Sequence, residues 1–260
     1  MAAPERLPPP GADELPRMSL IEHLEELRKR ILWSIVGMAV VFLPCWTYSK
    51  WVFDHFLAAP ILSYLPPPHQ LVYNKLSDPF ILYFKLACIL AIFAASPFIL
   101  YQAWCFIAPG LYPRERRFAL PFVLCTSDFF IGGGAFGYYV AFPRAAAFFF
   151  EIGKGLTPLI TVDTYLSFLT TVLLGMGLMF ELPVLIFLLS WLGVVTPRFL
   201  MRQFRWAVVI IFTIAAIVTP TPDIINQCVF AIPGVALYLL GVGAAYLVHR
   251  DKAKRQATAG

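Results

Sequence analysis

The chain has 260 residues, of which 60% are hydrophobic and 13% are charged, and its mean hydropathy is +0.75. Soluble globular domains are nearer half apolar and a quarter charged, so this composition excludes an ordinary soluble domain and predicts a membrane protein. The formal net charge of +5 would suit a nucleic-acid partner, but its meaning depends on where the basic residues lie.

The first thirty residues fall into two parts. Residues 1–17 hold Pro, Gly and charged residues without the apolar core of a cleaved signal peptide, which predicts a short disordered leader. Residues 18–30 predict an amphipathic arm, because leucines recur along one face at helical spacing. Two acid–base pairs four residues apart stabilise such a helix by ~0.2–0.5 kcal/mol each, Glu25–Lys29 and Glu26–Arg30.

Six apolar runs follow the arm and predict an all-α, polytopic membrane domain over residues 18–249. Their approximate bounds are 31–53, 79–104, 118–142, 163–191, 204–219 and 223–248. A helix needs about 20 residues to cross the ~30 Å core of a bilayer, so the short fifth run must thin the bilayer, use its flanking residues or lean on its neighbours. Prolines inside several runs predict a bent, cupped bundle of six transmembrane helices.

The distribution of basic residues predicts the orientation of this domain. Fifteen of the twenty Lys and Arg residues lie on one side of the predicted spans, including the tail at 250–260, and four lie on the other side. Cytoplasmic segments carry the excess of Lys and Arg, so both termini are expected in the cytoplasm. The basic charge thus reflects topology, and no nucleic-acid partner is expected.

Sequence motifs for enzymes and cofactors do not fit this chain. Residues 132–137 match GxGxxG, but no strand precedes them, and small residues at 133 and 137 instead favour close packing of two helices. The sequence has no GxxxxGK[ST], HExxH or GxSxG motif, and its five cysteines form no CxxC pair. The cysteines are interpreted as small buried hydrophobic residues, and no enzyme activity, cofactor or metal is expected.

Two acidic residues stand out from their surroundings. Glu181 lies within the apolar segment GMGLMFELPVLIF, where a charge costs several kcal/mol and usually faces the bundle interior or a wet cavity. It either marks a functional site or makes a structural hydrogen bond to a neighbouring helix. Glu115 lies among cations in a loop stiffened by two prolines, and it is either a local ion pair or part of a site.

Five motifs, in this order along the chain, resemble the TatC family. They are HLEELRKR at 23–30, YQAWCFIAPGLYPRERR at 101–117, FPRAAAFFFEI at 142–152, GMGLMFELPVL at 175–185 and TPTPDIINQ at 219–227. The resemblance covers residues 18 to about 249. TatC is the multispanning receptor of the twin-arginine protein translocase.

The resemblance implies a receptor in the bacterial cytoplasmic (inner) membrane that binds the signal peptides of folded cargo proteins. It further implies single-span partners of the TatA/TatB type, self-association in a larger complex and export driven by the proton gradient. The implied signal-peptide residues are Glu26, Glu115, Arg28, Phe106, Pro109 and Leu111. The implied intramembrane and partner residues are Glu181, Asp223 and Gln227.

Physical chemistry fits two separated acids to this role. An arginine guanidinium is a planar fork that the two oxygens of one carboxylate accept side by side, and two adjacent arginines need two such acceptors. A lysine ammonium lacks the fork and would not fully substitute. Glu25 stands beside Glu26, and only the motif assigns the contact to Glu26.

Two other classes of function were weighed. A proton-coupled transporter or channel would use Glu181, Lys85 and Asp128 as a relay, but the sequence lacks the paired broken helices typical of such folds. An intramembrane enzyme lacks a plausible nucleophile or metal pair. The receptor interpretation is favoured over both.

Overall fold

The computed structural model describes residues 20–107 except 63, 66, 68 and 69, then 119–219 and 223–259, with side chains omitted for Leu20 and 251–259. Within these ranges the chain is helical, and its one extended pairing is an isolated bridge between Val72 and Thr161. The predicted all-α class is confirmed. The leader at 1–17 and the loop with Pro109, Leu111 and Glu115 lie outside the described residues.

The described helices follow one another along the chain with short connections. They are α1 (Leu20–Val52), η1 (Phe53–Leu57), α2 (Ala59–Leu62), α3 (Asp78–Ile107), α5 (Ala119–Phe136), η3 (Gly137–Ala141), α6 (Phe142–Ile152), α7 (Val162–Phe180), α8 (Leu182–Trp191), α9 (Pro197–Arg202), α10 (Phe204–Val218) and α11 (Ile224–Ala259).

Six of these helical stretches are candidates for crossing a membrane. Five are long and apolar enough, namely Ile21–Leu62, Asp78–Ile107, Ala119–Ile152, Val162–Trp191 and Ile224–Arg250. The sixth, α10, has 15 residues and is about 22 Å long, shorter than the ~30 Å bilayer core. It packs on α11, as expected for a span that depends on its neighbours.

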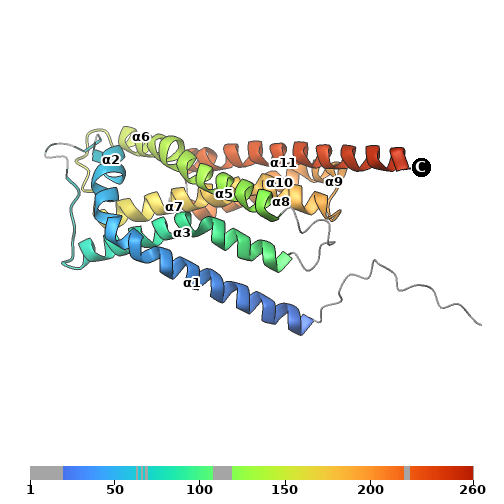
Figure 1. Cartoon of the computed structure of the whole chain (residues 1–260). Coiled ribbons are helices and arrows are strands. Elements are labelled where there is room, and N and C mark those ends of the chain that lie inside the picture. The colour runs from blue at the N-terminus through green and yellow to red at the C-terminus, as the bar shows by residue number, and fades with distance from the viewer. Residues whose placement is uncertain are drawn as a thin grey trace, which may run out of the picture.

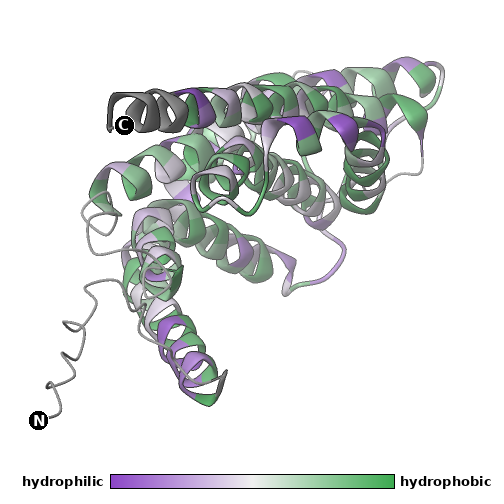
Figure 2. Cartoon of the chain, turned by 90° about the vertical axis from the view of Figure 1, so that its right-hand side faces the viewer, coloured by the Kyte–Doolittle hydropathy of each residue, from purple (hydrophilic) through white to green (hydrophobic). Residues whose placement is uncertain are grey.

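The helices form a bent bundle with α1 and α11 on opposite sides (Figure 1). The start of α1, the end of α3, the start of α5 and the end of α11 share one end of the bundle, which we call the terminal face. The opposite end, with α2 and the connection from α6 to α7, is called the far face. Hydrophobic residues predominate along the helices (Figure 2).

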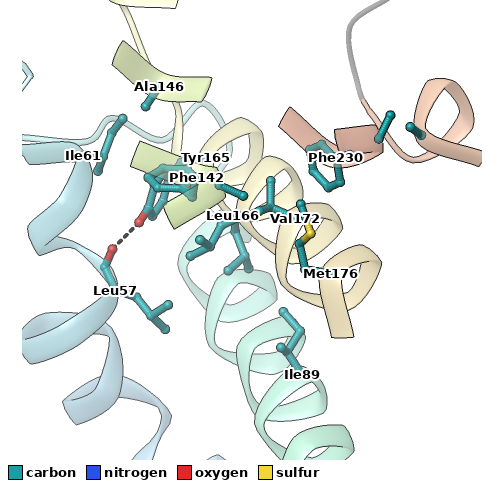
Figure 3. Close-up of a cluster of buried hydrophobic side chains, with 14 of the residues drawn as sticks. Leu57, Ile61, Ile89, Phe142, Ala146, Tyr165, Leu166, Val172, Met176 and Phe230 are labelled. Carbon is teal, nitrogen blue, oxygen red and sulfur yellow. Dashed lines mark hydrogen bonds between the residues drawn. The ribbon is translucent and has the colours of Figure 1, made fainter. Parts of the chain in front are cut away.

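The main core surrounds α7. Its largest fully buried side chains come from α3, α6, α7 and α11, and include Leu86, Phe142, Leu166, Leu169, Val172, Met176 and Phe230. Figure 3 shows these side chains converging from helices that are far apart in the sequence. Burial of this apolar area against α7 fixes the centre of the bundle.

Two tyrosines anchor the end of η1 to this core. The hydroxyl of Tyr165 donates to the carbonyl of Leu57, and the hydroxyl of Tyr138 donates to the carbonyl of Phe56 (Figure 3 for Tyr165). Carbonyls at a helix end lack intrahelical donors, so the hydroxyl of Tyr165 satisfies a carbonyl that would otherwise be buried unpaired, whereas the bond of Tyr138 is exposed.

Small residues bring α5 and α7 into close contact, which confirms the prediction from the glycine-rich segment. A Cβ atom at Gly133 would lie 2.6 Å from the carbonyl oxygen of Met176, and one at Gly137 would lie 3.1 Å from that of Val172. By contrast, a Cβ at Gly132 would meet no atom within 4 Å. Backbone contact at this distance is possible only with glycine.

Helix α1 is packed differently. It runs without interruption from Leu20 to Val52 and therefore joins the expected arm to the first span in one helix. It packs chiefly on α3, through edge contacts between aromatic rings such as Phe42 with Phe84 and Trp46 with Phe80. Most of its apolar surface stays exposed to the surroundings of the bundle.

The prediction that the cysteines are buried was wrong. Cys125 is exposed, the other four are half-buried, and all five are free thiols. They lie on helix faces that point partly out of the bundle, where a small apolar side chain meets lipid at little cost.

Candidate functional site

On the terminal face, the start of α1 contacts the end of α3 at two successive positions. The ring of His23 stacks on the ring of Phe106 with centroids 4.3 Å apart and an interplanar angle of 18°. Two turns further into α1, Arg30 reaches Gln102, one turn before Phe106 on α3. The two helices are antiparallel here, so successive turns of α1 meet successive turns of α3.

Glu26 lies on α1 between His23 and Arg30, the residues that make these two contacts. Its Oε1 accepts a hydrogen bond from Nη2 of Arg30 at 3.1 Å, and Nη1 of the same guanidinium donates to Oε1 of Gln102 at 3.2 Å. Gln102 is only 6% exposed, whereas the side chains of Glu26 and Arg30 are 17% and 28% exposed. The carboxylate is therefore partly shielded from solvent and held from one side only.

Glu25 and Arg28 point elsewhere. Both are exposed, and together with Lys29 and Trp33 they line a shallow groove of about 450 Å³ on the surface of α1. Of the two adjacent acids, Glu26 is the one near α3 and Phe106. Arg28 was predicted to share a patch with Phe106, and the structure places it with Glu25 instead.

Three predicted signal-peptide residues, Pro109, Leu111 and Glu115, lie outside the described residues. The segment that contains them follows Ile107 at the end of α3 and precedes Ala119 at the start of α5. Both attachment points belong to the terminal face, one of them next to Phe106 (Figure 1).

Glu181 lies at the junction of α7 and α8. Pro183 cannot donate a backbone hydrogen bond and interrupts the helix here, so the amide of Glu181 turns to the carbonyl of Leu178 at 3.2 Å. The Glu181 side chain is half-buried, and its Oε1 is buried without a hydrogen-bond partner among the described residues. A buried acceptor in this condition costs free energy unless another molecule supplies a donor.

An apolar groove of about 510 Å³ begins beside this junction. It runs between α5, α8 and α11 and is lined by Pro121, Phe122, Cys125, Phe129, Pro183, Val184, Phe187, Trp191, Leu240 and Ala244. Glu181 is thus two residues from Pro183 in the lining of this groove.

Asp223 and Gln227 have bonding partners inside the bundle. The carboxylate of Asp223 accepts from the amide of Asn226 at 2.7 Å and from its Nδ2 at 2.9 Å, which makes Asp223 the N-cap of α11. Nε2 of Gln227 donates to the carbonyl of Phe212 at 2.9 Å and ties α11 to α10. Both are distant from Glu181 along α11: Gly234, which packs on Met179 two residues before Glu181, lies about 16 Å along the helix from Asp223 and about 10 Å from Gln227.

Lys85 of the alternative relay is not brought close to Glu181. Nζ of Lys85 donates to Oδ1 of Asp163 at 2.7 Å, at the far-face end of α7. Asp163 and Glu181 are eighteen residues apart, about 27 Å along the helix axis. Within the described ranges no three His, Cys, Asp or Glu side chains gather as metal ligands.

Three residues of the terminal face were missed by reasoning from the sequence alone. His23, Arg30 and Gln102 all fall within the family-like motifs, but only the contact between α1 and α3 joins them. The available signal was Gln102 itself, a buried amide in an otherwise apolar helix, since such a group requires a polar partner.

Comparison with known proteins gives a consistent result. The sequence profile of the TatC family, described as Sec-independent protein translocase protein (TatC), matches residues 22–233. A Sec-independent protein translocase protein TatC from Koribacter versatilis is 46% identical over 248 residues, covering 94% of this chain and 91% of the relative. The protein of that name from Escherichia coli K12 is 37% identical over 224 residues, 86% of each chain.

The fold also matches a solved structure. The crystal structure of the twin arginine translocase receptor TatC superimposes with a TM-score of 0.76 at 34% sequence identity. The match covers 88% of this chain and all of that one.

Proposed function

The chain belongs to the TatC family of Sec-independent protein translocase proteins, and from this premise we propose that its terminal face binds twin-arginine signal peptides. It is a receptor component of the twin-arginine translocase and a multi-pass membrane protein. We propose that it recognises signal peptides and recruits single-span partners for the proton-gradient-driven export of folded proteins, without catalysing a bond-breaking step.

The observation that carries this proposal is the position of Glu26. Its carboxylate lies between α1 and α3, is partly shielded from water, and receives one donor from within the described residues. Partial burial strengthens a charge-assisted hydrogen bond, and a carboxylate can accept two parallel bonds from a guanidinium. Phe106, one turn from Gln102, offers an aromatic surface beside the acid.

Glu115 is proposed as the acceptor for the second arginine. The segment 108–118, which contains Glu115, Pro109 and Leu111, follows Ile107 of α3 and precedes Ala119 of α5, and both of these residues belong to the terminal face. Two acids from separate segments on one face match two adjacent guanidinium groups. Arg28 is proposed to tune the charge around this site from the outer surface of α1.

The test is co-purification of the full-length receptor with a precursor that carries a twin-arginine signal, compared with a twin-lysine version. Glu26→Gln and Glu115→Gln should each reduce recovery of the twin-arginine precursor about tenfold or more, because each removes a charge-assisted bidentate contact. Glu25→Gln, a change of the same kind on the exposed side of α1, should have little effect. Undiminished recovery with both variants would refute the proposal.

The terminal face is proposed to be cytoplasmic, in the bacterial inner membrane, with leader and tail on that side. The excess of Lys and Arg in the segments of this face supports the orientation. A single cysteine at Glu25 should react with a membrane-impermeant thiol reagent only in inverted membrane vesicles. Reaction in right-side-out cells would contradict the orientation.

Glu181 is proposed to meet a transmembrane helix of a TatA/TatB-type partner. Its unpartnered Oε1 and the adjoining apolar groove support this contact, because a visiting helix would cover apolar surface and supply a donor. Asp223 and Gln227 are proposed to shape a second contact for such partners at the far-face end of α11.

Crosslinking tests this intramembrane contact. In a receptor whose five native cysteines are replaced, Glu181→Cys should form a disulfide with a cysteine in the span of a partner. Val172→Cys, on the same helix but fully buried in the core, should not. If Glu181→Cys neither crosslinks nor reacts with a water-soluble reagent, Glu181 has a purely structural role.

A further inference from the structure

We propose that Arg30 acts as an internal competitor for the arginine of the signal peptide, and that Gln102 limits how strongly it competes. The inference rests on the proposed role of Glu26 as an arginine acceptor. It adds two specificity-determining residues that touch the acid or hold the group that touches it.

Arg30 already donates to the carboxylate of Glu26, as an arginine of the signal peptide would, but it makes only one hydrogen bond to it. Its Nη2 donates to Glu26 while its Nη1 is turned to Gln102 on α3. Its Nε is buried and donates to no described residue. The guanidinium therefore gives Glu26 a single hydrogen bond at 3.1 Å, where a free guanidinium can give two parallel bonds.

Gln102 is what keeps this contact single. Its side chain is almost fully buried on α3, and its Oε1 is fixed where only one end of the Arg30 fork can reach it. A guanidinium is planar, so a bond from Nη1 to Gln102 restrains the plane in which Nη2 meets the carboxylate. Without Gln102, Arg30 would be free to turn both terminal nitrogens toward Glu26.

The weak pair between Arg30 and Glu26 determines how strongly a side chain of the signal peptide must bind in order to displace Arg30. Pairs four residues apart on a helix contribute little, so a guest that forms two parallel bonds displaces Arg30 readily. A lysine ammonium offers a point charge without the fork and gains much less over the contact that it replaces. When displaced, Arg30 keeps its bond to Gln102, so its charge remains on the α3 side of the acid. The competitor thereby raises the preference for arginine over lysine.

The experiment measures dissociation constants of twin-arginine and twin-lysine signal peptides for the purified full-length receptor in lipid nanodiscs. Arg30→Gln should strengthen twin-lysine binding about fivefold and twin-arginine binding about twofold, which lowers the preference. Gln102→Leu should weaken twin-arginine binding about fivefold, because Arg30 then pairs fully with Glu26.

The double variant Arg30→Gln/Gln102→Leu distinguishes competition from a structural role. If Gln102 acts through Arg30, the double variant binds like Arg30→Gln alone. If Gln102→Leu weakens binding equally in both backgrounds, Gln102 only supports the helix pair and the inference is overturned. The inference also fails if Arg30→Gln weakens both peptides, since Arg30 would then contribute to binding.

Two controls separate this result from other effects. Lys29→Gln removes one positive charge from the exposed side of the same turn and should leave the preference unchanged. An equal response to Lys29→Gln would mean that general electrostatics, and not competition, sets the preference. Glu26→Gln in the same assay tests the proposed function by itself: if it loses binding while Arg30→Gln has no effect, only the inference about Arg30 fails.

Discussion

Helices α7 and α1 both belong to apolar stretches long enough to span a membrane, yet they are packed in opposite ways. In the most apolar 18-residue segment of the α7–α8 span half of the residues are buried, whereas none are buried in that of the α1 span. Around α7, side chains from α3, α6 and α11 close a continuous core (Figure 3). Around α1, contacts come chiefly from α3.

This difference in packing suggests that α7 maintains the fold, whereas α1 is available to bind another molecule. Regions with few buried contacts open at low free energy, and binding sites are commonly drawn from them. The proposed arginine acceptor lies at the loosely packed end of α1, while Glu181 lies where α7 leaves the core. Glu26 is thus on the loosely packed helix, and Glu181 is at the edge of the closely packed one.

The largest expected effect comes from closing the space between α5 and α7. Gly133→Ala should lower the free energy of unfolding by about 2–3 kcal/mol, because the new Cβ would lie 2.6 Å from the carbonyl oxygen of Met176 and 2.9 Å from Cα of Gly177. Thermal unfolding of the purified receptor in detergent measures the loss. Gly132→Ala, which meets no atom within 4 Å, should be nearly neutral.

Equal effects of the two glycine substitutions would mean that helix propensity, and not contact with α7, sets the response. The rigid centre assigned to α7 would then lose its main support. A large loss confined to Gly133 would sharpen the comparison with α1, where a Cβ at Gly37 would meet the Phe98 side chain as its nearest atoms and not a backbone.

A smaller effect is expected at the anchor between α7 and η1. Tyr165→Phe removes the donor for the carbonyl of Leu57 while keeping the ring, so stability should fall by about 1–2 kcal/mol. Tyr139→Phe, on an exposed ring near the same end of the bundle, should change stability by less than about 0.5 kcal/mol. Peptide binding at the terminal face should stay unchanged in both variants.

If Tyr165→Phe weakened peptide binding as much as it lowered stability, the two regions would not be separable. Measuring both quantities on the same preparations decides this. The far-face anchor would then have to transmit its state along α1 to the terminal face.

The parts of the structure that could be predicted from the sequence are those governed by local pattern. Hydrophobic runs predicted helices, and the small residues at 133 and 137 predicted a close helix contact. Both features depend only on residues that are near one another in the sequence. Asp223 could have been predicted as a helix cap, since an acid directly precedes the apolar run of α11. The family resemblance instead predicted only a role for Asp223 in partner contact.

The contacts that define the terminal face could not be predicted in this way. Arg30 and Gln102 are 72 residues apart, and their bond depends on the register in which α1 packs on α3. The sequence pattern paired Glu26 with Arg30 correctly, but it gave no sign that the same guanidinium is shared with α3. Side chains that serve two helices are visible only once the helices are placed.

The smallest expected effect on stability, and the most informative one for α1, comes from His23→Ala. The His23 ring stacks on Phe106 at a half-buried position, so its loss should cost only about 0.5 kcal/mol of stability. Twin-arginine peptide binding should nevertheless weaken about threefold, because Phe106 loses the ring that fixes its orientation beside Glu26. Thermal unfolding and peptide affinity, measured together, check this. His23→Phe keeps a stacking ring and should restore affinity; a variant that loses stability and binding in proportion would place α1 within the rigid part of the molecule after all.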